Sequence, residues 1–268
     1  MSLFHSSSGS TLEAGADGAS DRPPILRIRN VSKSFGHGDD VTTALNDVSL
    51  DVAEGEFVTI VGASGCGKST LLNLVAGLDA PTSGTIEAGG KVAFMFQEAT
   101  LLPWMTARQN VELALKLSKV PRSARTSRAD ELLETVRLEG WGDKRPHELS
   151  GGMRQRVALA RCLAQDARIV LMDEPLGALD AMTRDHLHDE IEHVARTQGL
   201  SVIFVTHNMR EAIRLGDRVI LMGSLPGRIV YEELIPLPHP RVMDSPEVAT
   251  RAANLTARLK EQGHTHVG

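Results

Sequence analysis

Residues 62–69 read Gly-Ala-Ser-Gly-Cys-Gly-Lys-Ser, which matches the phosphate-loop pattern G-x-x-x-x-G-K-[S/T]. Glycines let backbone N–H groups converge on an anion, and the N-terminus of a following helix adds the positive end of its dipole. Lys68 would reach the β and γ phosphates, and the Ser69 hydroxyl would ligate Mg²⁺. The segment predicts a nucleoside triphosphate site; the alternative is a glycine-rich turn without a ligand. The expected phosphate-binding residues are Gly62, Ala63, Ser64, Gly65, Cys66, Gly67, Lys68, Ser69 and Thr70.

Polar residues also follow three other predicted strands, at the point where each strand ends. In an open parallel sheet, ligands bind beyond the carboxyl ends of the strands, so these residues should meet the phosphate loop. A lone glutamine or histidine would more often be an ordinary surface residue, but together, beside a phosphate loop, they predict a catalytic site. They are Gln97 after residues 92–96, Asp173 and Glu174 after residues 169–172, and His207 after residues 202–205.

Phosphoryl transfer suggests a role for each of these side chains. Asp173 would hold Mg²⁺ directly or through water, and Glu174 would polarise the attacking water as general base. Gln97 would sense Mg²⁺ or that water, and His207 would hydrogen-bond the γ-phosphate and orient the catalytic groups. The expected metal ligands are therefore Ser69, Gln97 and Asp173.

A second anion-binding helix end is predicted near the middle of the chain. Ser150 and the amides of Gly151 and Gly152 open a predicted helix that runs to about Ala164. One chain does not need two such ends to bind one nucleotide.

The elements that would position these groups alternate between strands and helices. Apolar runs separated by helical sequence predict an α/β fold whose sheet is mainly parallel, after a β-rich, antiparallel N-terminal part. The predicted strands are residues 25–31, 47–52, 57–61, 92–96, 169–172, 202–205, 219–222 and 229–231, and a predicted helix follows the phosphate loop over residues 69–76.

Two further helical regions are predicted. Residues 100–165 have helical periodicity, with one face formed by Ala129, Leu132, Leu133 and Val136, and we assign them to a helical subdomain inserted in the core. A last helix begins with Ser245 as N-cap and Pro246 at its first position. Its polar face is not strongly basic, so its apolar stripe should pack on the domain rather than on lipid. That stripe is Val248, Ala252, Leu255 and Leu259.

The composition fits one globular unit. The chain has 268 residues, 41% hydrophobic and 24% charged, with a net charge of -5. This charge provides no general attraction to nucleic acid, and no apolar run approaches the roughly 20 residues of a membrane span. Cys66 and Cys162 lie too far apart to suggest a disulfide framework, and both are expected to be small buried or loop residues in a reducing compartment. Residues 1–22 are predicted to be a disordered tail without the features of a secretory signal, so the cytoplasm is expected.

Residues 149–156 read Leu-Ser-Gly-Gly-Met-Arg-Gln-Arg and resemble the LSGGQ signature of the ABC transporter ATPase family. In that family the signature faces the γ-phosphate of ATP held by the other subunit. The resemblance, over residues 25–235, implies a RecA-like P-loop NTPase that hydrolyses ATP as a homodimer. Met153 replaces the usual Gln, which changes little because the backbone and Ser150 make the phosphate contacts.

Other family elements follow in order. Gln97 matches the Q-loop, His207 matches the switch histidine, and residues 177–180 look like the D-loop, which implies that Asp180 lies at the dimer seam. Phe35 stands where the family has an aromatic side chain that stacks on adenine; the alternative is a core phenylalanine. The implied domain covers residues 25–268. It comprises a nucleotide-binding core (25–99 and 166–235), the helical subdomain (100–165) and a C-terminal extension (236–268).

Residues 96–104 and 225–229 look like the nitrate, sulfonate and taurine importer ATPases. Aliphatic sulfonate import is our first expectation, with nitrate, taurine or a related small anion as alternatives. The resemblance implies transmembrane permease subunits, a periplasmic or lipid-anchored solute-binding protein, and a peripheral place on the cytoplasmic face of the membrane. Residues 101–105 would lie where the family docks the coupling helices of the permease; simple core packing is the alternative.

Three other functions are less consistent with the sequence. An ABC ATPase acting on nucleic acid or ribosomes would carry long coiled-coil insertions or tandem ATPase units, and we expect no nucleic-acid partner. A small-molecule kinase would have no use for a signature helix or a D-loop. Exporter ATPases are often fused to their membrane part.

Overall fold

The computed structural model describes residues 22–36, 40–177, 179–224 and 226–264. The predicted tail therefore lies, except for Arg22, outside the described residues. The strands are β1 (Pro24–Phe35), β2 (Thr42–Ala53), β3 (Phe57–Gly62), β4 (Ser83–Ala88), β5 (Val92–Met95), β6 (Ile169–Asp173), β7 (Ser201–Thr206), β8 (Arg218–Gly223) and β9 (Arg228–Leu234). The helices are α1 (Lys68–Val75), α2 (Ala107–Leu117), α3 (Arg122–Thr135), the 3-10 turn η1 (Pro146–Glu148), α4 (Gly151–Leu163), α5 (Ala181–Thr197), α6 (Met209–Leu215) and α7 (Pro246–His264).

Two sheets organise the molecule. The first has the order β2-β1-β4 and is antiparallel; the second has the order β5-β6-β7-β3-β8-β9, with only β9 antiparallel to its neighbour. The residues of β3 and β7 are all buried, as expected for central parallel strands covered on both faces. The parallel α/β core with an antiparallel N-terminal sheet confirms the predicted fold class.

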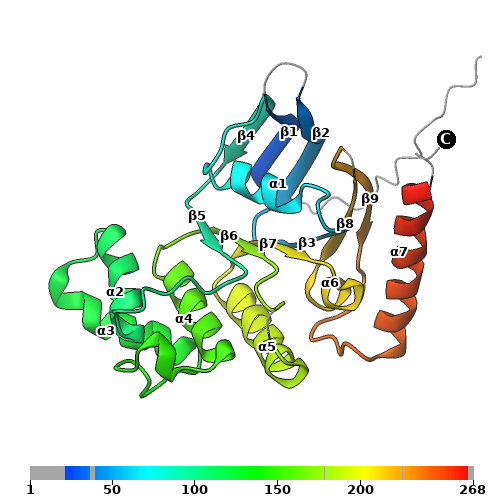
Figure 1. The fold of residues 1–268 in the computed structure, drawn as a ribbon. Helices are drawn as coiled ribbons and strands as arrows, with labels where there is room; N and C mark the ends of the chain where they lie inside the picture. The colour runs from blue at the N-terminus through cyan, green and yellow to red at the C-terminus, as the bar shows by residue number, and fades with distance from the viewer. Residues whose placement is uncertain (1–21, 37–39, 178, 225, 265–268) are drawn as a thin grey trace, which may run out of the picture.

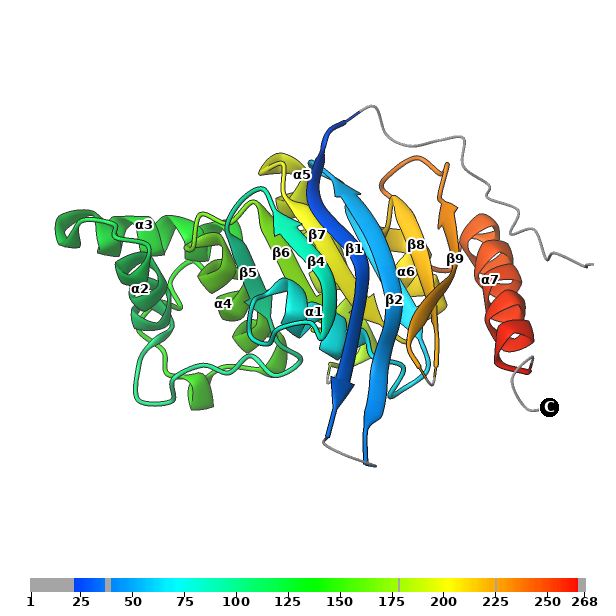
Figure 2. The same cartoon turned by 90° about the horizontal axis from the view of Figure 1, so that it is seen from above.

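Helices cover the second sheet on both faces. Figures 1 and 2 show α1 between the two sheets, with α4, α5 and α6 on the opposite face of the six-stranded sheet and α2 and α3 at one end. One apolar core joins the sheet to α2–α5, and another fills the space between the sheets around α1. Packing on both faces of the sheet thereby fixes the positions of the carboxyl ends of β3, β6 and β7.

The predicted helical faces are confirmed. Ala129, Leu132, Leu133 and Val136 are buried in the first core. On α7, Val248, Ala252 and Leu255 are buried against α6 and the β8 strand, and Leu259 packs beside them. The Ser245 hydroxyl accepts a hydrogen bond from Val248 N–H at 3.3 Å, which confirms the predicted cap. Among the described residues, no helix combines the length and the apolar character needed to cross a membrane.

β4 was missed by the sequence prediction. Its residues Ser-Gly-Thr-Ile-Glu-Ala are nearly all exposed, so the apolar alternation of a half-buried strand is lacking. The strand forms because it pairs with β1, where Ile28 lies opposite Ile86. The predicted strands at residues 25–31 and 47–52 are parts of the longer β1 and β2.

Candidate active site

The phosphate loop connects β3 to α1, and each of its glycines has a distinct steric reason. A Cβ atom at Gly62 would lie 2.6 Å from both the Cys66 sulfur and the Met222 carbonyl oxygen. Gly65 and Gly67 have φ angles of 78° and 96°, a region that side chains rarely allow. The loop therefore requires glycine at these positions to adopt its conformation.

Lys68 is buried at the start of α1, and its ammonium group lies on the loop itself. Nζ donates to the Gly62 and Ala63 carbonyl oxygens at 2.9 and 3.1 Å. The Cys66 sulfur lies 3.9 Å from the same nitrogen. Burial raises the pKa of the Cys66 thiol, although the charge of Lys68 opposes the rise. Cys66 and Cys162 are both buried free thiols. Burial raises the pKa of each thiol, which disfavours the thiolate, the reactive form of cysteine.

Asp173, at the end of β6, reaches the phosphate loop. Its carboxylate lies close enough to the Ser69 side chain and to the charge of Lys68 for both to act on it. Burial raises the pKa of Asp173 and the charge of Glu174 raises it further, while Ser69 and Lys68 lower it. A carboxylate and a hydroxyl in contact, with a second carboxylate nearby, are the oxygen donors that Mg²⁺ prefers.

Glu174 and His207 face each other across neighbouring strands. Glu174 Oε2 lies 2.9 Å from His207 Nδ1, so the ring N–H donates to the carboxylate. The Glu174 backbone N–H donates to the Val205 carbonyl oxygen at 3.0 Å, which joins the end of β6 to β7. Glu174 also has a φ of 44°, an uncommon value outside glycine. The pair is held at the sheet edge to which the phosphate loop also belongs.

Gln97 is exposed after β5, and its backbone carbonyl accepts from Gln155 Nε2 on α4 at 2.7 Å. A Cβ atom at Gly177 would lie 3.5 Å from Gln97 Nε2 and 3.9 Å from Glu174 Oε2. The side chains of Gln97 and Glu174 therefore approach the same small residue.

The second predicted helix end is the N-terminus of α4. Ser150 caps it, accepting from Met153 N–H at 3.2 Å. Asp180 caps α5 in the same way, accepting from Thr183 N–H at 3.0 Å. A Cβ atom at Gly152 would lie 2.4 Å from the Thr183 methyl group, so the two helix starts pack closely. The structure thus groups Ser150, Gly151 and Gly152 with Asp180. Ala178, in the predicted D-loop, and Leu225 lie outside the described residues.

Phe35 lies at the end of β1 with 46% of its surface exposed. The Lys33 ammonium lies 4.9 Å from the ring centroid. The alternative of a core phenylalanine is therefore wrong, and the exposed ring is accessible to a stacking base.

Supporting residues beneath the phosphate loop were missed by the sequence reasoning. Gly227, in the turn between β8 and β9, donates to the Ala44 carbonyl oxygen at 2.9 Å. A Cβ atom there would lie 2.1 Å from the Cys66 carbonyl oxygen, so only glycine fits under the loop. In the sequence, Gly227 stood out only as part of the resemblance over residues 225–229, because nothing local indicates which distant segment this turn touches.

A groove of about 740 Å³ lies next to the segment that follows Gln97. It is lined by Leu102, Asn110, Leu113 and Leu117 with a cationic rim, and Leu117 is among the exposed large apolar residues. Trp104 nearby is 67% exposed. Leu101, by contrast, packs on the core, so core packing accounts for Leu101 but not for Trp104. The rim cations are Lys91, Lys119 and Arg161.

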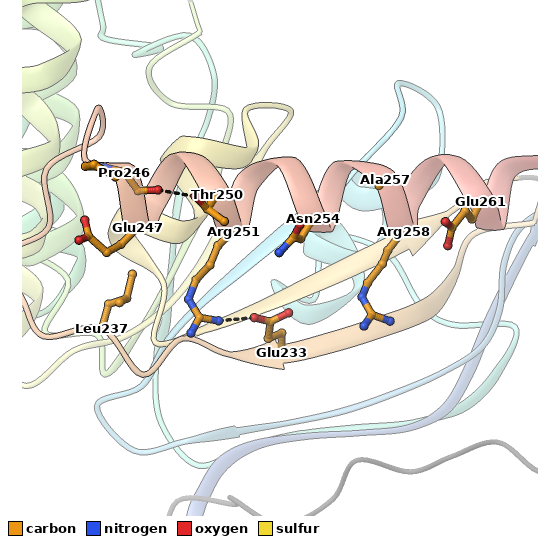
Figure 3. Close-up of a pocket in the computed structure, with 10 residues that line it drawn as sticks. All are labelled: Glu233, Leu237, Pro246, Glu247, Thr250, Arg251, Asn254, Ala257, Arg258 and Glu261. Carbon is orange, nitrogen blue, oxygen red and sulfur yellow. Dashed lines mark hydrogen bonds and ion pairs between the residues drawn. The ribbon is translucent and has the colours of Figure 1, made fainter.

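A second groove, of about 970 Å³, lies along α7 and is separate from the phosphate loop. Figure 3 shows Arg251 reaching from α7 to Glu233 on β9, where the ion pair measures 2.6 Å. Arg258 lies over the Tyr231 ring at 4.5 Å. These contacts attach α7 to the sheet edge and contribute no group to the candidate active site.

A family model described as ABC transporter matches residues 45–177. An aliphatic sulfonates import ATP-binding protein of Bacillus licheniformis is 46% identical over 84% of this chain and 90% of its own length. A taurine import ATP-binding protein of Jannaschia is 45% identical over 79% of this chain and 82% of its own length.

Among solved structures, a similar fold is a dimeric ATP-binding cassette in a post-hydrolysis state with ADP and Pi bound. It has a TM-score of 0.71 and 35% identity, and the match covers 80% of this chain and 100% of that one.

Proposed function

This chain belongs to the ABC transporter family as the ATP-binding, ATP-hydrolysing subunit of an importer, and from this premise we propose that it energises the uptake of aliphatic sulfonates. Relatives named for aliphatic sulfonate import match at 46% identity over 84% and 88% of the chain. The observation that carries the catalytic part of the proposal is the Glu174–His207 pair beside the Lys68 loop. Taurine is the second candidate, because taurine import relatives match at 45% and 44%.

We propose the following roles in hydrolysis. Lys68 and the loop amides, from Gly62 to Thr70, bind the phosphates of ATP, and Phe35 stacks on the base. Glu174 takes the proton of the attacking water, while His207 orients that carboxylate through its 2.9 Å contact and hydrogen-bonds the γ-phosphate.

Mg²⁺ fits the oxygen donors at the end of β6. Asp173 and Ser69 would hold it, with Gln97 as a further ligand or a sensor, and it would neutralise charge developing on the phosphates. Burial and the neighbouring Glu174 raise the pKa of Asp173, so a cation there would stabilise its charged form.

We propose that two copies assemble head to tail, with Ser150, Gly151, Gly152 and Asp180 of one copy facing ATP on the other. Such an arrangement gives the second helix end an anion to bind. The dimeric state of the similar cassette supports the proposal.

The groove beside residues 101–105 is the proposed docking site for the permease subunits. It joins apolar residues such as Leu113 and Leu117 to a cationic rim, which suits a short amphipathic helix. A periplasmic or lipid-anchored solute-binding protein would complete the importer. The chain would lie peripherally on the cytoplasmic face, with no nucleic-acid partner.

Growth of a deletion strain tests the transport proposal. We expect the strain to lose growth on alkanesulfonates as sole sulfur source and to grow normally on sulfate. A plasmid carrying the wild-type gene should restore growth, whereas one carrying Lys68→Ala should not. Loss confined to taurine, or to nitrate as sole nitrogen source, would assign the importer to that solute; normal growth on every sulfonate would refute the first choice.

A further inference from the structure

A buried chain of hydrogen bonds ties the turn that carries His207 to α5. The Thr206 hydroxyl at the end of β7 donates to Glu211 Oε2 on α6. Glu211 Oε1 lies 2.5 Å from His188 Nε2 on α5. Glu211 is 5% exposed, and Thr206 and His188 are also buried. Three elements are thus joined by side chains for which phosphate binding gives no reason.

The donors and acceptors of this chain can be assigned from its partners. Arg214 Nη1 lies 2.9 Å from His188 Nδ1, and a guanidinium only donates, so Nδ1 accepts. The ring proton then lies on Nε2 and is donated to Glu211. Arg214 Nη2 is in turn bound by Asp189 of α5 at 2.5 Å. Glu211 therefore accepts from two sides, and losing one donor would leave part of a buried carboxylate unsatisfied.

These hydrogen bonds hold the residues on both sides of His207. The Thr206 hydroxyl, besides donating to Glu211, accepts from the Asn208 backbone N–H at 3.0 Å. Asn208 caps α6, accepting from Arg210 N–H at 3.0 Å. His207 lies between these two residues and makes its 2.9 Å contact with Glu174. Glu211 thus helps to hold the residues on both sides of His207.

At its other end the chain of hydrogen bonds reaches α5, and the first turn of α5 packs on the start of α4. Asp180 caps this helix, and Thr183 occupies the space beside Gly152. We propose that Glu211 and His188 are positioning residues that couple α5 to His207, so that a partner seated on Asp180 and Ser150 sets the geometry of the hydrolytic pair. This proposal rests on the proposed roles of His207 and Glu174.

Kinetics of purified full-length variants test the coupling. Glu211→Leu removes both acceptors and Thr206→Val removes the hydroxyl. We expect each to lower kcat for ATP hydrolysis by about 10-fold to 100-fold, because small displacements of catalytic groups have effects of this size. KM for ATP should stay within about twofold, since the phosphate loop is untouched.

Glu192→Leu is the matched control. Glu192 is a carboxylate of α5 with 6% exposure that contacts His239 Nδ1 at 2.6 Å, so it shares the burial and the histidine partner of Glu211. Glu192 contacts His239, which lies in the segment before α7, whereas Glu211 contacts Thr206 at the end of β7. We expect this variant to lower the melting temperature as Glu211→Leu does, while kcat stays within about twofold of wild type.

A double variant distinguishes positioning from general damage. If Glu211 acts through His207, Glu211→Leu should lower kcat by less than about twofold in a His207→Ala background. Multiplicative losses would overturn the proposal, as would a Glu211→Leu variant with wild-type kcat or a Glu192→Leu variant with an equal loss. Wild-type protein that fails to hydrolyse ATP, or a His207→Ala variant with full activity, would instead refute the proposed roles at the active site.

Discussion

Asp173 and Glu174 are neighbours in the chain, but their carboxylates lie in different surroundings. Asp173 is the last residue of β6 and contacts Ser69, and its pKa is raised mainly by burial. Glu174 lies beyond the strand, with a φ of 44° and its carboxylate 2.9 Å from His207. The two residues are therefore suited to different tasks.

At the residue scale we predict that Glu174→Gln abolishes turnover and preserves ATP binding. The amide cannot take a proton from water, and general-base catalysis contributes about 10²-fold to 10⁴-fold. Phosphate release measures the loss, and titration with ATP measures the affinity. Glu87→Gln on exposed β4 serves as the control. Wild-type hydrolysis by the Glu174 variant would remove it as the base.

Among the elements, the hairpin of β8 and β9 supports the phosphate loop. Its turn residue Gly227 contacts backbone atoms of Ala44 and Cys66, so the hairpin, β2 and the loop meet at one point. No side chain can enter this contact without moving backbone. The conformation of the phosphate loop thus depends on an element that is remote in sequence.

Gly227→Ala should weaken ATP binding by at least about tenfold, because overpacking costs about 1–3 kcal/mol and the strain falls on the loop. Isothermal titration with ATP measures the change. Gly223→Ala is the matched control in the same hairpin, since its Cβ would meet only the Val230 side chain at 2.8 Å among close contacts. Equal affinities of the two variants would refute the proposed support.

The segment between β9 and α7 is anchored at the C-terminal end of α6. Arg241 donates to the carbonyl oxygens of Ile213, Gly216, Ile235 and Leu237. Burial lowers its pKa to about 10. These bonds satisfy carbonyls at the end of α6 that would otherwise lack partners.

His239, two residues before Arg241, makes the stability contributed by this segment dependent on pH. Burial lowers the pKa of His239, and the charges of Arg241 and Arg196 also lower it, but the contacts with Asp217 and Glu192 outweigh them and raise it. The pKa of Asp217 is lowered to about 2, because the contact with His239 at 3.3 Å and the hydrogen bond from Phe57 N–H outweigh the effect of burial. A histidine whose pKa is raised by folding stabilises the folded state. This stabilisation is complete below pH 6.5, the ordinary histidine pKa, and is lost as the pH rises through the pKa of the folded state.

We therefore predict that His239→Gln destabilises the protein more at acidic than at alkaline pH. Urea unfolding of both proteins at about pH 6 and about pH 9 measures the difference in free energy of unfolding. Tyr231→Phe, at the sheet edge, should show no such dependence. A difference that stays constant, or that grows with pH, would contradict the assignment of His239 as the protonated partner.

On the scale of the whole molecule, the two helix ends proposed to bind the phosphates lie on different elements. Lys68 begins α1 on the six-stranded sheet, and Ser150 caps α4 on the helical side. A second copy is the simplest way to use both ends for one nucleotide, and the similar cassette is dimeric.

We predict that Glu174→Gln protein forms a dimer in the presence of ATP and Mg²⁺ and dissociates when ATP is removed. Trapped nucleotide should hold the copies together because hydrolysis cannot proceed. Light scattering after size exclusion measures the mass. Adding Lys68→Ala should abolish the dimer, since the phosphates lose their charged partner. A strictly monomeric Glu174 variant, even beside its permease, would contradict the shared site.

The sequence by itself determined the features that depend on near neighbours. Glycines at residues 62–67 and the lysine after them specify a phosphate loop, because close backbone approach and positive φ are local demands. Strand ends could be read from apolar runs, so Asp173, Glu174 and His207 could be placed at one sheet edge before any contact was known.

Only the tertiary structure decided the features that depend on distant segments. It paired the polar β4 with β1, exposed Phe35, placed Gly227 under Cys66 and joined Thr206 to His188 through Glu211. Each depends on which remote atoms fill the adjacent space or complete a buried hydrogen bond. The spacing of residues along the sequence does not predict such partners, because distant segments come into contact only when the whole chain has folded and packed.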